Sequence, residues 1–133
     1  MLSRFDEYPI HQTPEPLAHN MSSDRNVYDR SWFNGFATDG SYFFGLTMGV
    51  YPNRGILDCA FSTISRNSPQ HCLHASRLAP ADRGELAAGP LRIEVVEPMR
   101  RIRVVVEDNP SGICCDLTFS TRSAAIRGGR QTL

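Results

Sequence analysis

Alternation of apolar and polar residues with a period of two is the feature that most constrains this chain. It is clearest between residues 42 and 51. One face of that run would carry Tyr42, Phe44, Leu46, Met48 and Val50. The other would carry Phe43, Gly45, Thr47, Gly49 and Tyr51. Successive side chains of a β-strand point to opposite faces, so this run is predicted to be a strand with apolar groups on both sides.

Similar runs recur at intervals of about ten residues and are separated by turn sequences. They cover residues 32–37, 56–64, 71–79, 91–95, 102–106 and 113–120, with a short further run at 85–87. Asp39-Gly40 is a favoured pair for a tight hairpin, and Pro52 and Gly55 suit the ends of a turn. About seven strands with short connections and no helical intervals predict an all-β fold. We expect an antiparallel meander that forms a barrel, or a half-barrel or sandwich.

Three segments are predicted along the chain. Residues 1–30 contain Pro9, Pro14 and Pro16 and are expected to be an irregular leader. Residues 31–121 are expected to form the antiparallel β domain. Residues 122–133 lose the alternation and are expected to be a disordered or truncated tail. A meander that stops there would leave an edge strand to be covered or paired, which suggests a fragment of a larger sheet.

Composition removes several classes of function. All 14 basic residues are arginine, and 14 acidic residues bring the formal net charge to zero. Without lysine there can be no Schiff base and no P-loop lysine. A domain with balanced charge lacks the excess of basic residues that is typical of a nucleic-acid-binding domain. The sequence contains neither a signal peptide nor an apolar run of about 20 residues, so it predicts a cytoplasmic protein without a membrane span.

The histidines and cysteines do not predict a metal or redox centre. His71, Cys72 and His74 are close in sequence, but residues three apart on a strand point to opposite faces. The four cysteines are interpreted as free thiols. No nucleophile elbow and no glycine-rich phosphate loop is found, so we expect no cofactor.

Asp58 is the candidate catalytic residue. It lies in the middle of a predicted strand, and a carboxylate inside a barrel would need a partner or a ligand. Arg54 is one possible partner. The alternative is that Asp58 faces solvent or forms a structural pair with Arg54. The candidate ligand-binding residues are Tyr51, Arg54, Asn34, Phe43 and Trp32. The aromatic members of this set could equally belong to the core.

The order of several segments resembles that of a known group. The segments are YDR-x-x-FNG from Tyr28, DGSYFFG from Asp39 and YPNRG-x-x-D from Tyr51. Across about residues 5 to 122, the chain resembles the N-terminal part of bacterial proteins of the hydroxyneurosporene synthase-like (carotenoid 1,2-hydratase, AttH-like) group. The resemblance implies a lipocalin-like barrel, usually the first of two in a chain more than twice this length. It also implies hydration of an isoprenoid double bond without a metal or organic cofactor. The acid-catalytic residues proposed for the hydratases match no position here.

Three functions therefore compete. The first is a lipocalin-like domain that binds an apolar small molecule, such as a lipid or isoprenoid, in space left by Gly45 and Gly49. The second is part of a hydratase in which a protonated Asp58, oriented by Arg54 or Tyr51, donates a proton to an alkene. The third is a non-catalytic half-barrel that pairs with a second lipocalin-like domain or forms a homodimer.

Overall fold

The computed structural model describes residues 2–128, which form eight β-strands and three short 3₁₀ helices. The strands are β1 (Asp29–Phe36), β2 (Tyr42–Tyr51), β3 (Ile56–Ser65), β4 (His71–Leu78), β5 (Leu86–Ala88), β6 (Leu91–Glu97), β7 (Arg101–Val106) and β8 (Cys115–Ser120). The helices are η1 (Arg4–Glu7), η2 (Leu17–His19) and η3 (Pro52–Arg54). The predicted all-β class is confirmed.

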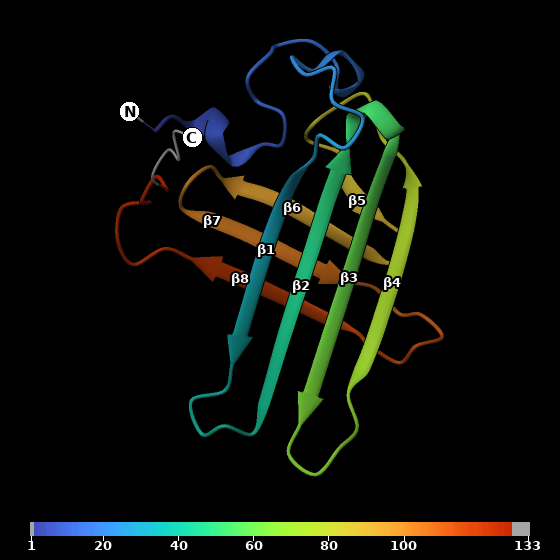
Figure 1. Ribbon diagram of the computed structural model, residues 1–133. Helices are drawn as coiled ribbons and strands as arrows, with labels where there is room; N and C mark the ends of the chain where they lie inside the picture. The colour runs from blue at the N-terminus through green and yellow to red at the C-terminus, as the bar shows by residue number, and fades with distance from the viewer. Residues whose placement is uncertain (1, 129–133) are drawn as a thin grey trace.

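The strands form two antiparallel sheets of four. The first sheet has the order β1-β2-β3-β4, and the second has the order β5-β6-β7-β8. Every hydrogen-bonded neighbour is also a neighbour in sequence, so each sheet is a meander, as predicted. Neither sheet closes on itself within the described residues. The second sheet lies across one face of the first, and its strands cross those of the first steeply (Figure 1). Of the predicted architectures, the structure has the two-layered, open form.

The turns have the geometry that their residues favour. Between β1 and β2, the carboxylate of Asp39 accepts a hydrogen bond from the Ser41 amide at 2.9 Å, and Gly40 has φ 70°. Between β2 and β3, η3 ends at Gly55, which has φ 65°. Residues other than glycine rarely adopt these left-handed φ values, so the two glycines allow the tight connections.

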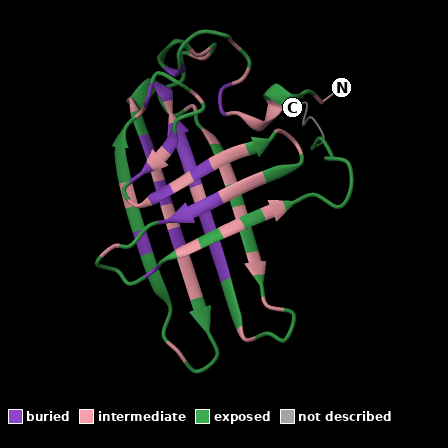
Figure 2. Cartoon of the chain, turned by 180° about the vertical axis from the view of Figure 1, so that it is seen from behind, coloured by how far each residue is buried: buried purple, intermediate pink, exposed green. Residues whose placement is uncertain are grey.

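Apolar side chains from both sheets form one core between the layers (Figure 2). Alternate residues of each strand contribute to it, which is why the sequence has a period of two. Its fully buried side chains are Leu17, Leu46, Val50, Leu57, Leu91, Val104 and Val106. The other face of each sheet points away from the core.

The leader is irregular but anchored. Leu17 is fully buried, and its amide donates to the carbonyl of Ala81 at 3.3 Å. The Ile10 amide donates to the carboxylate of Asp29 at 2.9 Å. The Arg83 guanidinium donates to the carbonyls of Ile10 and Glu15. The leader is therefore held against one end of the sandwich.

Residues 122–128 contain neither helix nor strand, and the rest of the predicted tail, 129–133, lies outside the described residues. Among residues 2–128, none of the helices has the length and apolar character needed to cross a membrane.

Candidate functional site

The first sheet is longer than the second and extends beyond it at one end (Figure 1). There, Tyr42 and Phe44 of β2 and His71 of β4 lie on the inner face next to the beginning of β8. The loop at residues 111–114 and Leu117 of β8 form the facing wall. The space between them is a cavity of about 490 Å³. We call it the aromatic cleft.

A series of aromatic rings leads from this cleft into the core. Tyr42 stacks on Phe44 with ring centres 6.3 Å apart, and Phe44 stacks on Phe61 at 5.8 Å. Phe44 also meets the edge of Phe119 at 6.2 Å, and Phe119 contacts Phe33 at 4.9 Å. These separations lie in the favourable range for aromatic pairs. We call the five residues the aromatic row.

A glycine fixes the position of the central ring of this row. Gly35 of β1 is paired directly with Phe44 of β2. A Cβ atom at Gly35 would lie 2.6 Å from Cε1 and Cζ of Phe44, far inside van der Waals contact. The Phe44 ring therefore occupies the space that a side chain at position 35 would need. This cross-strand pairing of a glycine with an aromatic ring covers the backbone and holds the ring in place.

The facing wall is a preformed loop. The side-chain amide of Asn109 donates to the carbonyls of Glu107 at 2.6 Å and Ile113 at 2.7 Å. Its oxygen accepts from the Ser111 amide at 3.0 Å. The loop that closes the cleft is thus braced from inside by one residue.

The cleft also has polar side chains. His71 is exposed, and the hydroxyl of Thr63 donates to the carbonyl of Phe43 at 3.1 Å. Burial raises the pKa of Cys115, so that thiol stays protonated and is a poor nucleophile. Tyr42, Phe44, Phe61, Ile113 and Leu117 form the apolar part of the lining, and Thr63, His71 and Ser111 add polar side chains.

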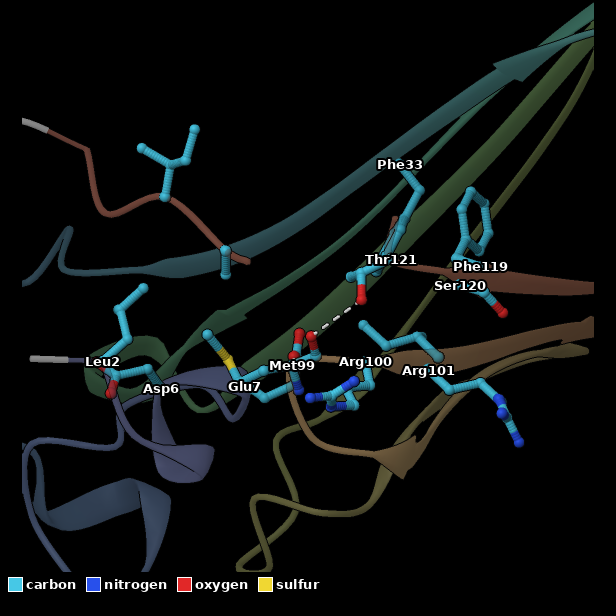
Figure 3. Close-up of a pocket in the computed structure, with 13 residues that line it drawn as sticks. Leu2, Asp6, Glu7, Phe33, Met99, Arg100, Arg101, Phe119, Ser120 and Thr121 are labelled. Carbon is cyan, nitrogen blue, oxygen red and sulfur yellow. Dashed lines mark hydrogen bonds between the residues drawn. The ribbon is translucent and has the colours of Figure 1, made fainter. Parts of the chain in front are cut away.

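A second opening lies beside β1, where Leu2 and residues 125–126 approach the sandwich (Figure 3). It has a volume of about 410 Å³ and is lined in part by Phe33 and Phe119, the inner members of the aromatic row. The carboxylate of Glu7 accepts a hydrogen bond from the Met99 amide at 2.6 Å, which ties η1 to the turn between β6 and β7. The row thus joins the two openings, and its rings fill the space between them.

Five of the six candidate residues selected from the sequence lie on one face of the first sheet, and that face points away from the core. Trp32, Asn34, Phe43, Tyr51 and Asp58 share the outer face of the first sheet. The expectation that Asp58 lies inside a barrel is corrected, because its neighbours Leu57 and Cys59 occupy the core side of β3. Asp58 is only half-buried. The described residues place no cover over it, which a protonated acid would require.

Arg54 is directed elsewhere. Its guanidinium donates to the side chain of Asn26. The arginine beside Asp58 is instead Arg30, which donates to the hydroxyl of Tyr51 at 2.6 Å. That hydrogen bond, with a smaller contribution from the charge of Asp58, raises the pKa of Arg30.

A groove of about 450 Å³ on this outer face contains polar side chains that the sequence reasoning did not select. His74 and Ser76 of β4 line it together with Arg30 and Asp58. Within residues 2–128 no hydrogen bond joins Ser76, His74 and Asp58, so they do not form an activated nucleophile. His71 and His74 lie on opposite faces of β4, as the strand geometry requires. The described residues include no group of three or more His, Cys, Asp or Glu side chains that could hold a metal ion.

Comparison with known proteins identifies the family. No curated protein and no solved structure matches this chain. The profile of a family of unknown function, DUF8625, matches residues 2–133, which is nearly the whole sequence. The chain therefore belongs to the DUF8625 family.

Proposed function

We propose that this domain binds an apolar small molecule, such as a lipid or isoprenoid, in the aromatic cleft. One observation carries the proposal. The partly exposed ring of Tyr42 lines a cavity of about 490 Å³. The same ring stacks on Phe44, which stacks on Phe61 in the core. An apolar ligand could lie against Tyr42 and extend the aromatic row outward. The resemblance to the hydroxyneurosporene synthase-like group supports the same class of ligand.

The size and polarity of the cleft suit a ligand with one polar end. Small-molecule sites typically have volumes of about 300–1,000 Å³ and combine apolar walls with a few polar groups. In the aromatic cleft, His71 and Ser111 are exposed polar side chains, while the Thr63 hydroxyl is already bonded to the Phe43 carbonyl. A hydroxyl or carboxyl group of the ligand would lie there, with its hydrocarbon part on Tyr42.

Binding is better supported than hydration. A hydratase needs a general acid within reach of the double bond. Asp58 lies on the opposite face of the first sheet, and the described lining of the cleft has no carboxyl group. The proposal is therefore a binding domain without turnover.

The experiment is a fluorescence titration with a conjugated polyene fatty acid. Tyr42 is 44% exposed, so about 90 Å² of an aromatic side chain of about 200 Å² is available to a ligand. Covering that area contributes at most about 2 kcal/mol. Tyr42→Ala should therefore weaken binding by about 5- to 30-fold.

Two further variants complete the design. Val96→Ala removes an exposed apolar side chain of the second sheet and should leave the dissociation constant unchanged. Phe43→Ala removes the neighbouring aromatic ring, which is exposed to the same extent as Tyr42 but on the opposite face. Loss of affinity in Phe43→Ala but not in Tyr42→Ala would move the ligand to the outer face. Absence of binding by the wild-type protein would reject the proposal.

A further inference from the structure

The outer face of the first sheet exposes an unusual number of large apolar side chains. Trp32 is 61% exposed and Phe36 is 72% exposed. The same face carries Phe43, Ile56, Ile64 and Leu78, all of them exposed, and the exposed Tyr28 joins it through its contacts with Tyr51 and Arg30. An apolar patch of this kind, spread over four strands, is typical of a surface that associates with another protein.

The strand register arranges this face in rows. In one row, Arg30 of β1 and Asp58 of β3 flank Gly49 of β2. In the next, Trp32 and Ala60 flank Thr47. A third row, at the far end of the strands, is made of Phe36, Phe43 and Ile64.

We propose that this outer face pairs with the same face of a second copy of the chain, across a two-fold axis that runs parallel to β2. Such an axis keeps each row opposite itself and exchanges its two sides. β1 of one copy then faces β3 of the other. Each residue on β1 meets the residue at the other end of its own row, and each such contact occurs twice, as in any isologous interface.

The charges on this face are complementary under that operation. Arg30 of each copy lies opposite Asp58 of the other, which gives two ion pairs related by symmetry. Tyr51 accepts a hydrogen bond from the Arg30 guanidinium at 2.6 Å, and Tyr28 lies under that guanidinium at 5.1 Å. The cation is therefore already positioned, which lowers the entropy cost of pairing. Arginine in such a setting is typical of protein interfaces.

The remaining rows are complementary in shape and polarity. One edge of the Trp32 indole lies over Gly45, with Cη2 3.3 Å from the position of a Cβ there. The other end of the Trp32 row in the second copy would be Ala60, a small residue that leaves room for the exposed part of the indole. At the end of the strands, Phe36 would face Ile64, and Phe43 would face its own copy. In these rows, each apolar group therefore meets an apolar or small partner.

The outer face of the first sheet is large enough for a specific interface. Three opposed strands of about ten residues cover on the order of 500 Å² per copy in projection. The pair then reaches about 1,000 Å², the lower limit for a specific interface. The axis keeps β2 of the two copies parallel, and the twist of each sheet separates the rows toward the strand ends, so rows near the middle of β2 stay best opposed. The row of Arg30 and Asp58 is one row away from Thr47, at the centre of β2.

This inference does not depend on the proposed function. The aromatic cleft opens on the inner face of the first sheet, so face-to-face pairing leaves it free. A ligand-free dimer and a ligand-binding monomer are therefore distinguishable results.

Sedimentation equilibrium of the full chain tests the pairing, at concentrations up to about 200 µM because an interface of this size is weak. The wild type should dimerise. Arg30→Asp and Asp58→Arg each place like charges opposite one another twice, and each should weaken self-association at least about tenfold. An equimolar mixture should recover dimers with wild-type affinity, since both pairs are then restored between unlike copies. Recovery on mixing cannot come from an interaction within one chain.

The control is Arg101→Asp, which reverses an exposed charge on the second sheet and should leave self-association unchanged. Circular dichroism and the melting temperature verify that each variant is folded. A wild type that stays monomeric throughout would overturn the proposal. Two single variants that do not associate when mixed would overturn the row-by-row pairing.

Discussion

Replacing Gly35 by alanine tests the aromatic row at its tightest point. The new methyl group would lie 2.6 Å from two carbon atoms of the Phe44 ring. Carbon atoms in contact are normally about 3.5–4.0 Å apart, so the ring must move by about 1 Å. Phe44 is only 7% exposed and packs on Phe61 and Phe119, so a shift of this size disturbs both ring contacts.

The expected loss of stability in Gly35→Ala follows from two opposing effects. Overpacking a core costs about 1–3 kcal/mol. Alanine also restricts the unfolded chain more than glycine, which stabilises the protein by about 0.4–1 kcal/mol where the native backbone allows alanine. The net loss is about 1–2 kcal/mol, which should lower the melting temperature by roughly 4–8 °C in a domain of this size.

Gly45→Ala is the matched control, on the partner strand and the opposite face. Its methyl group would meet the edge of the Trp32 indole at 3.3 Å and Phe43 Cε1 at 3.9 Å, and the Trp32 ring is 61% exposed and able to move. We expect a change within about 0.5 kcal/mol. Thermal and urea unfolding, followed by circular dichroism, measure both variants. If Gly35→Ala is as stable as Gly45→Ala, the Phe44 ring is not confined as described.

Three other predictions concern stability and local order. The Arg103 guanidinium holds the pKa of Asp116 below its ordinary value through a hydrogen bond of 2.6 Å, so this contribution is present above about pH 4 and is lost as the pH falls further. Melting temperatures between about pH 6 and pH 3 should therefore fall less steeply for Asp116→Asn than for the wild type, and equal slopes would contradict the pairing. Arg83→Ala should increase hydrogen exchange in residues 10–17 and leave β2 protected, because it removes two hydrogen bonds to the leader; unchanged exchange would show that the leader is held without them. Met99→Gly should stabilise the protein by about 0.5–1 kcal/mol in urea unfolding, because Met99 has φ 65°; a loss of stability would mean that its side-chain contacts outweigh the strain.

The strands could be predicted from the sequence because their signal is local. Leu57, Cys59 and Phe61 alternate with more polar residues along β3, and this pattern alone assigns the core face of that strand. In β2 the pattern is ambiguous, because Phe43 and Phe44 are both aromatic. Pairing with β3 decides which of the two is buried. The pairing of Gly35 with Phe44 also leaves room for the Phe44 ring on the core side, and this pairing is known only from the strand register.

The division into two sheets could not be predicted in the same way. Whether a meander closes depends on hydrogen bonds between strands far apart in sequence, and alternation does not contain that information. The candidate site shows the same limit. Period two and an antiparallel register place Trp32, Phe43 and Asp58 on one face, but they do not say whether that face is covered. The aromatic cleft was missed for this reason, since it exists only because the first sheet extends past the second.

Photoaffinity labelling tests the central claim, that an apolar ligand occupies the aromatic cleft, most directly. A fatty acid with a diazirine in its hydrocarbon chain would be bound, irradiated and located by peptide mass spectrometry. We predict covalent label on Tyr42, Ile113 or Leu117, and a reduction of labelling in Tyr42→Ala. Label concentrated on Trp32 and Phe43, or spread without saturation over both faces, would contradict the claim.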